Sequence, residues 1–397
     1  MVSGRVYVLG AGFSMAVSSE VPAEARMPDM RALSDAVVAK FRQEMPVARY
    51  AEAIDEASIF SEDYRGMVKL LMREGNLDAF NDTMRNWSLL VLIPGFATPL
   101  VKNFEQWLSF LIESPPWLTP AELARNRAAF LQIADEIATI LRSRQQSTVE
   151  AHNGNCPAWL SKLVRTWELQ QAKVITFNYD QLVELAWLSA RNIQNRARSL
   201  DLYPAPLTPL VARTGAIPPA PAVSGGFELL KLHGSIGWWY SGPDAPPGDV
   251  VYDQGMRGFA WSLEGLEADQ ETTTLAADRV PMIVPPAAVK SPYYNNSVVR
   301  ALWRSAAEAL HAADELVLMG FSLPPSDMLV SSMLCTNVSR RCKIIPVNPD
   351  PTIIDRVCAT FGIEPDDERL DKDYVGKDGE PIWDAIPKWV EDWHVRW

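Results

Sequence analysis

Six short apolar runs, each bounded by turn residues, constrain the fold of this chain more than any other feature. They occupy residues 5–9, 173–177, 227–232, 282–284, 315–319 and 343–347. Their length fits β-strands, and because most of their residues are apolar, both faces should be buried, as in a parallel sheet. Segments with helical periodicity lie between several of them, at residues 299–313, 327–338 and 351–361. The sequence therefore predicts an α/β fold built on a doubly wound parallel sheet.

The last of these helices carries signals at both ends. Asp350 stands at the N-cap position and Pro351 at the first helical position. Gly362 follows the last periodic residue, where a left-handed residue ends many helices. These signals predict a helix directly after the last strand.

A long section between the first two strands is helical in pattern. Residues 29–45 and 121–141 each place their apolar side chains on one face. We predict a helical insertion over residues 16–170. Two other stretches, the Pro- and Ala-rich residues 203–226 and the Gly-, Pro- and acid-rich residues 241–279, are predicted to be loop insertions.

Composition narrows the class of protein. The 397 residues include 48% hydrophobic and 22% charged residues, which is typical of a globular protein. The net charge of -12, from 37 basic and 49 acidic residues, argues against a generic nucleic-acid binder. The longest apolar stretches, residues 88–93 and 316–323, are shorter than a membrane helix requires. The N-terminus reads as a first strand rather than an export signal, so we expect a cytoplasmic protein without a membrane partner.

The cysteines do not suggest a metal site. Within the sequence no C-x-x-C pair occurs, and the four cysteines are scattered at Cys156, Cys335, Cys342 and Cys358. Zinc modules and redox motifs need closer spacing. We expect no bound metal and a reducing compartment.

A glycine turn follows the first strand. Gly10, Ala11, Gly12, Phe13 and Ser14 precede a predicted helix, a context in which backbone amides can approach a phosphate. Met15 stands where the third glycine of G-x-G-x-x-G would be. The motif alone fits either a tight strand exit or, at the first strand, a dinucleotide site.

Polar residues follow the next two strands. Asn178 and Asp180 come after the second strand, at the edge where ligands collect in open α/β sheets. They also fit a turn and the N-cap of a helix over residues 181–190. His233 follows the third strand, whereas the remaining histidines are assigned structural roles, at His152, His311 and His394.

Small and polar residues also follow the last two strands of the predicted sheet. Gly320 and Ser322 come after residues 315–319, and Asn348 follows residues 343–347. Ser326 or Asp327 would cap the helix between these strands. Five strand ends would therefore supply small and polar groups to one edge.

These blocks, GAGFS, FNYD, LHGS, GFSLPPSD and VNP, resemble in order and spacing the conserved blocks of the sirtuin-like NAD-binding family. Residues 103–111, NFEQWLSFL, resemble a helix of its prokaryotic, defence-associated branch. The resemblance spans about residues 4–350. It implies a Rossmann-like NAD-binding catalytic domain over residues 1–15 and 171–362.

The resemblance also implies roles for individual residues. Gly10 to Ser14 would hold the NAD pyrophosphate, while Asn178 and Asp180 would bind the nicotinamide-side ribose and carboxamide. His233 would take the position of the catalytic base. Ser322 and Asn348 would hold the adenosine half, with Gly320 also in the cofactor-binding set.

Two departures from the deacylases of this family favour its NAD-consuming hydrolases. The chain lacks their zinc module of two cysteine pairs, and Phe177 stands where they have glutamine before the asparagine. The resemblance therefore implies an NAD hydrolase that releases nicotinamide and ADP-ribose, or its cyclic isomer, in anti-phage defence. A protein deacylase or ADP-ribosyltransferase and a non-catalytic NAD or nucleotide sensor remain the alternatives.

Regulation is expected to lie outside the catalytic site. An enzyme that depletes NAD must be kept inactive before infection, and the sequence shows no added effector-sensing domain. We therefore expect a homo-oligomer or a separate regulatory partner, such as a ring-forming ATPase or an Argonaute-type protein.

A Trp-rich segment over residues 363–397 ends the chain. Trp383, Trp389, Trp393 and Trp397 lie in its last fifteen residues, and the last three recur every fourth residue. On a helix these three form one stripe, which we expect to pack on the body of the same chain. A self-association or partner surface is the alternative.

Overall fold

The computed structural model describes residues 4–43, 104–113, 116–191, 198–215, 226–255, 261, 274–285, 293–324, 327–376 and 381–394. The chain divides into a larger unit, Met1–Met30, Ala138–Val284 and Lys290–Trp397, and a smaller unit, Arg31–Ile137 and Pro285–Val289. The predicted apolar stretch at residues 88–93 and Asn103 lie outside the described residues. No helix in the described ranges combines the length and apolar character that a bilayer crossing requires.

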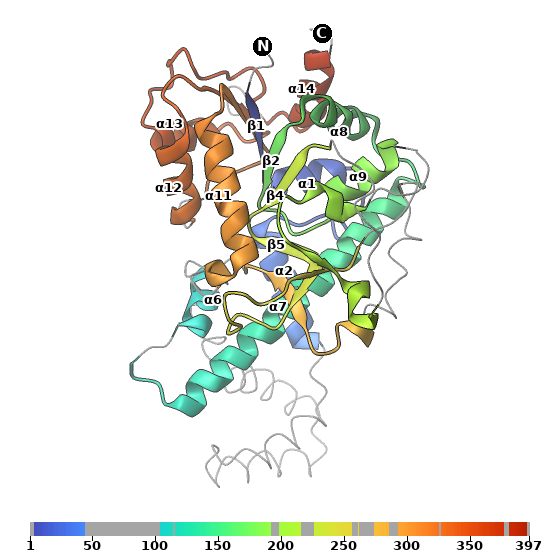
Figure 1. Ribbon diagram of the computed structural model, residues 1–397. Coiled ribbons are helices and arrows are strands. Elements are labelled where there is room, and N and C mark those ends of the chain that lie inside the picture. The colour runs from blue at the N-terminus through green and yellow to red at the C-terminus, as the bar shows by residue number, and fades with distance from the viewer. Residues whose placement is uncertain are drawn as a thin grey trace, which may run out of the picture. The chain divides into compact units, whose positions relative to one another are not determined.

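A five-stranded parallel sheet forms the centre of the larger unit (Figure 1). Its spatial order is β4-β2-β1-β8-β9. The strands are β1 (Arg5–Leu9), β2 (Lys173–Thr176), β4 (Glu228–Lys231), β8 (Glu315–Met319) and β9 (Lys343–Val347). When these five strands are numbered in chain order, their order across the sheet is 3-2-1-4-5, as in dinucleotide-binding folds. In such folds the topological switch point lies between the first and fourth strands.

Register and burial agree with the predicted pattern. Val8 pairs with Ile175 of β2 on one side and Leu318 of β8 on the other. From its second residue onward β1 is buried on both faces. The predicted α/β fold with a doubly wound parallel sheet is thereby confirmed.

Helices cover both faces of this sheet. Figure 1 shows α11 (Ser297–His311), α12 (Met328–Asn337) and α13 (Ile353–Phe361) on one side. On the other side lie helices that share an aromatic core around Trp167, whose indole packs 5.4 Å from the Tyr7 ring and 5.3 Å from the Phe227 ring, measured between centroids. These helices are α1 (Ala11–Val17), α8 (Ala158–Gln170), α9 (Leu182–Arg191) and α14 (Ala385–His394).

The helix ends differ slightly from the sequence signals. Helix α13 begins at Ile353 rather than Pro351, because Asp350 accepts a hydrogen bond from the Thr352 backbone N–H at 2.9 Å and closes a turn first. Gly362 does end this helix in a left-handed conformation, with φ of 61°. Asp327 caps α12, as one of the two predicted candidates.

The prediction for residues 282–284 is wrong in one respect. They belong to β7 (Val280–Ile283), which lies in a separate four-stranded sheet of order β3-β6-β5-β7. Its other strands are β3 (Thr208–Pro209), β5 (Gly234–Tyr240) and β6 (Tyr252–Asp253). Three apolar residues do not distinguish a parallel core strand from an antiparallel one.

Both predicted loop insertions contain short regular elements. Residues 203–226 contain β3 and the 3-10 helix η3 (Leu210–Thr214), and residues 241–279 contain β6. The other short 3-10 helices are η2 (Ser199–Leu202) and η5 (Tyr293–Asn295). Each strand of two residues pairs mainly through backbone atoms, so it leaves no hydrophobic period in the sequence.

Three further helices precede β2 in the chain. They are α2 (Met30–Gln43), α6 (Phe104–Ile112) and α7 (Pro120–Ala151). The predicted helices at residues 29–45 and 121–141 are therefore confirmed, and α7 continues ten residues further than the pattern predicted. The described residues of the motif at 103–111 are helical in α6.

Two tryptophans of the predicted stripe, Trp389 and Trp393, pack on the chain itself, as expected. Trp389 is buried, lies 6.1 Å from Tyr7 and stacks on Trp393 with ring centroids 5.7 Å apart. Arg5 lies 4.5 Å above the Trp393 ring. Trp383 is exposed, and Trp397 lies outside the described residues.

The glycine after β8 offers a test of the sheet's central contact. Gly320 has φ of 58°, and a Cβ there would lie 2.3 Å from the Phe13 backbone nitrogen. Gly320→Ala should therefore lower the free energy of unfolding well beyond the roughly 1–2 kcal/mol of left-handed strain. Gly362→Ala is the matched control, because it has a similar φ of 61° and a Cβ there would meet no heavy atom within 4 Å. Equal losses in urea unfolding would contradict the packing argument.

Candidate functional site

The glycine turn after β1 lies against the turn after β8. The backbone N–H of Gly10 donates to Met319 O at 3.1 Å, and that of Gly12 donates to Gly320 O at 2.9 Å. A Cβ on Gly10 would lie 2.6 Å from the Phe321 Cα. These glycines are therefore required for two backbones to approach closely at the switch point. Because the backbone N–H groups of Gly10, Gly12 and Phe13 already have backbone partners, the pyrophosphate role of residues 10–14 stays a prediction.

Ser14 joins the turn to the segment after β2. Its hydroxyl donates to Asp180 Oδ2 at 2.6 Å and accepts from Asn178 Nδ2 at 2.9 Å. The same amide nitrogen donates to Gly10 O at 2.8 Å. Residues from two separate motifs thus form one hydrogen-bonded network at the carboxyl edge of the sheet. Ala11 and Phe13 lie on the same turn, Ala11 exposed and Phe13 buried against Trp159 and Trp167.

Asn178 and Asp180 differ in whether their side-chain oxygens can accept a hydrogen bond from a ligand. Asp180 is 5% exposed, and its Oδ1 accepts from the Leu182 backbone N–H at 3.1 Å, so it also makes the helix-capping contact considered from the sequence. Asn178 is partly exposed, and its side-chain oxygen has no hydrogen-bond donor among the described residues. That oxygen can accept a hydrogen bond from a ligand hydroxyl.

A buried charged cluster lies behind this segment. Lys231, at the end of β4, donates to the Asp180 backbone oxygen and lies 3.1 Å from Glu184. Its side chain is 1% exposed and that of Glu184 is 0% exposed. Tyr203 donates its hydroxyl to Glu184 at 2.7 Å, and burial raises the pKa of Tyr203 well above its usual value. The cluster fixes the backbone that carries Asp180.

His233 lies at the end of β4 among aromatic rings. Its ring centroid is 5.0 Å from that of Phe177 and 6.3 Å from that of Tyr179. Its Nε2 is 3.5 Å from Asp327 Oδ2, an ion pair when the imidazole is protonated. Both side chains are nearly buried. Gly234 follows with φ of 81°, and a Cβ there would lie 2.0 Å from Met282 O, which explains the glycine of LHGS.

Phe177 connects His233 to the glycine turns. Its ring stacks on Phe321 with centroids 4.9 Å apart, and the Phe321 backbone lies against Gly10. Asn348 Nδ2 donates to Phe321 O at 3.4 Å. Ser322 is exposed and its backbone oxygen accepts from Arg356. The predicted residues therefore sit at one edge, with direct side-chain bonds among Ser14, Asn178 and Asp180 and indirect contacts to the others.

Sequence reasoning missed two residues that the structure places at this edge. Asp327 was considered only as a helix cap, although it faces His233 as well. Lys231 was read as part of an apolar strand, and a charged residue inside such a run was the signal available. No three His, Cys, Asp or Glu side chains in the described ranges gather as metal ligands do.

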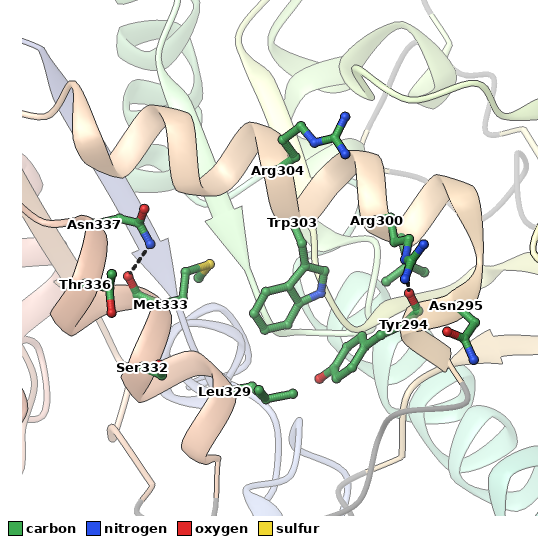
Figure 2. Close-up of a pocket in the computed structure, with 11 residues that line it drawn as sticks. Tyr294, Asn295, Arg300, Trp303, Arg304, Leu329, Ser332, Met333, Thr336 and Asn337 are labelled. Atoms are coloured by element: carbon green, nitrogen blue, oxygen red, sulfur yellow. Dashed lines mark hydrogen bonds between the residues drawn. The ribbon is translucent and has the colours of Figure 1, made fainter.

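A cavity of about 650 Å³ lies between α11 and α12 (Figure 2). None of the predicted site residues is among its described lining.

Comparisons with known proteins add one distant likeness. No protein-family model matches the chain, and no curated protein matches it. Among solved structures, the chain is similar to one described as "Structural Basis for the Mechanism and Regulation of Sir2 Enzymes", with 16% sequence identity and a TM-score of 0.36. The match covers 76% of this chain and 90% of that one. The fold assignment rests on the strand order and parallel pairing, and no argument about activity rests on this likeness.

The buried lysine allows a sharp test of what holds this edge. Lys231→Met should lower the free energy of unfolding by roughly 3–5 kcal/mol, because Glu184 is left as an unpaired buried charge. Lys173→Met is the matched control: Lys173 also pairs with a glutamate, Glu228, but both side chains are about 40% exposed. There the expected loss is at most about 1 kcal/mol. Similar losses in chemical denaturation would contradict the assignment.

Asp253 makes stability depend on pH. Burial, with a smaller contribution from the Glu184 charge, raises the pKa of Asp253 from 3.8 to about 7 in the folded protein. The folded state therefore disfavours the ionised form, so stability falls as the pH rises from about 4 to about 7. The loss contributed by this group approaches about 1.4 kcal/mol per pH unit.

Asp253→Asn should make the free energy of unfolding less dependent on pH between about 4 and about 7. The measurement is urea unfolding at several pH values in this range. Asp373→Asn, at an exposed position, is the control and should retain the wild-type slope. An unchanged slope in Asp253→Asn would show that the ionisation of Asp253 does not limit stability in this range.

Proposed function

We propose that this protein is an NAD hydrolase that cleaves the bond between nicotinamide and ribose. The observation that carries the proposal is the network joining Ser14 to Asn178 and Asp180 at the switch point of the sheet. It unites two motif blocks, GAGFS and FNYD, at the place where open α/β folds bind their ligands. His233 lies at the same edge with a carboxylate partner.

The chemistry needs few groups. The nicotinamide of NAD leaves as a neutral molecule from a pyridinium cation, so no acid has to protonate the leaving group. Ordinary glycosidases require such an acid besides a second carboxylate. Here the protein has only to hold the ribose, stabilise a cationic transition state and deprotonate the attacking water.

The described contacts support a division of roles. The side-chain oxygen of Asn178, which has no donor within the described part of the chain, can accept from a ribose hydroxyl, whereas both Asp180 oxygens already accept hydrogen bonds. In this proposal Asp180 positions Ser14 and Asn178, and His233 accepts the proton from water as a new bond forms at the ribose carbon. Asp327 then stabilises the imidazolium, as a carboxylate does for other catalytic histidines. The products are nicotinamide and ADP-ribose, or the cyclic isomer if a second group of the substrate replaces water.

A biological role follows from the same proposal. NAD depletion by such an enzyme would stop growth of an infected cell, in keeping with the defence-associated branch that the motifs resemble. We propose that self-association or a separate regulatory partner restrains the activity before infection. A deacylase or transferase would need an acceptor, and a sensor would bind NAD without turnover.

Nicotinamide release tests this function. The full chain is incubated with NAD, nicotinamide is quantified by chromatography, and NAD binding is measured separately by calorimetry. His233→Ala should lower release at least about 100-fold while binding persists, because only the proton acceptor is lost. Asn178→Ala should also lower release. His311→Ala, at an exposed histidine on α11, is the matched control and should behave as wild type.

Four outcomes would contradict the proposal. Absence of NAD binding would remove the dinucleotide site, and wild-type turnover in His233→Ala would remove the histidine from the chemistry. Release that requires an acylated peptide would identify a deacylase instead. Binding without turnover in every preparation, including one mixed with cell extract, would favour a sensor.

A further inference from the structure

The cavity between α11 and α12 has the size of a small-molecule site. Its volume of about 650 Å³ falls within the usual range for such sites. Its described lining residues belong to the larger unit, with one wall from η5 and α11 and the other from α12 (Figure 2). The candidate site at the sheet edge shares none of its described lining residues, so the cavity requires its own explanation.

The charge of the lining is positive. Arg300 and Arg304 lie one turn apart on α11, and no acidic residue occurs in the described lining. This contrasts with the net charge of -12 of the chain. Arg300 Nε donates to the Tyr294 backbone oxygen at 3.1 Å, which fixes that side chain. Paired guanidinium groups without carboxylates favour a phosphate-bearing ligand.

Arg304 is available for such a ligand. It is exposed, and its guanidinium has no hydrogen-bond or ion-pair partner within the described part of the chain. In Figure 2 it turns away from the Trp303 ring, and as a long exposed side chain it can rotate toward a bound anion.

Aromatic rings form the centre of the same wall. Trp303 lies between the two arginines in sequence, and its ring packs edge-on against Tyr294 with centroids 5.0 Å apart. The buried Tyr294 hydroxyl has no hydrogen-bond partner among the described residues. Burial and the nearby Asp327 charge raise the pKa of Tyr294, so the hydroxyl stays a donor. Buried donors in native proteins are generally paired, which points to a missing acceptor.

The facing wall completes a mixed lining. Leu329 and Met333 of α12 supply apolar atoms, and Thr336 supplies a hydroxyl. Leu329 is half exposed, so its side chain is accessible to a ligand that enters from solvent. An aromatic ring held between Trp303 and these apolar side chains would remove them from water.

We propose that this cavity is a binding site for a small nucleotide. The base lies against Trp303 and the apolar side chains of α12, and the phosphates pair with Arg300 and Arg304. This inference goes beyond the proposed hydrolysis of NAD and does not depend on it. An acidic peptide would satisfy the arginines but lacks the ring that the aromatic wall favours.

The cavity is linked to His233 by two described contacts. Trp303 Nε1 donates to the backbone oxygen of Leu232, the residue before His233, at 3.1 Å. Asp327, which caps α12, faces the imidazole itself. A nucleotide between α11 and α12 therefore touches both elements that hold His233.

ATP binding to the full chain tests the site. ATP has no nicotinamide, so the proposed hydrolysis cannot consume it during a calorimetric titration. Arg304→Glu should weaken binding about tenfold or more, because it replaces a charge-assisted bond with repulsion. Thr336→Trp should do the same by filling the cavity. Arg341→Glu, at an exposed arginine outside the cavity, is the matched control and should bind as wild type.

Hydrogen exchange locates the bound nucleotide. ATP should slow exchange in residues 294–304 and 329–337. Three results would overturn the inference: no ATP binding at millimolar concentration, equal binding in wild type and both cavity variants, or binding that Ser322→Trp abolishes while Arg304→Glu leaves it intact. The last result would place the nucleotide at the sheet edge instead. Unchanged melting temperatures of the variants would confirm that they fold.

Discussion

The backbone of the turn after β1 touches the backbone of the turn after β8, and the placement of the candidate functional residues depends on this contact. Gly12 donates to Gly320 O, and side chains at Gly10, Gly12 or Gly320 would collide with the opposite turn. The two turns meet at the topological switch point, where the connections that follow neighbouring strands run in opposite directions. Ser14 emerges from this contact toward Asn178 and Asp180.

Buried charge is the second constraint on the edge. Lys231 and Glu184 are nearly inaccessible to water. Burial of both charges has a desolvation penalty, but removal of one partner destabilises the protein more, because the other charge is left buried and unpaired. Because Lys231 also bonds the Asp180 backbone oxygen, its position determines that of the FNYD segment. The geometry of the hydrogen-bonded network is thus set by residues that do not themselves reach the candidate site.

Much of this arrangement could be predicted from the sequence. Buried parallel strands read as continuous apolar runs, so the bounds of β1, β8 and β9 were predicted without error. The convergence of their ends followed from topology alone. The strands of the second sheet were missed or misplaced, because β3 and β6 contain two residues each and β7 was indistinguishable from a core strand.

The pairings within the site were less accessible to sequence reasoning. Asp327 is explained by its structural role as the N-cap of α12. Nothing in the sequence therefore indicated that it also faces His233. The glycines had two possible explanations: their spacing predicts a phosphate site, and the structure shows that the close approach of two backbones also requires them.

A crystal structure with a carba-analogue of NAD, whose glycosidic bond cannot be hydrolysed, tests the central claim most directly. The account predicts the analogue along the sheet edge, with its diphosphate beside the Gly10 turn and its nicotinamide-bearing ring facing Asn178 and His233. An analogue bound only between α11 and α12, or with that ring remote from the imidazole, would contradict it.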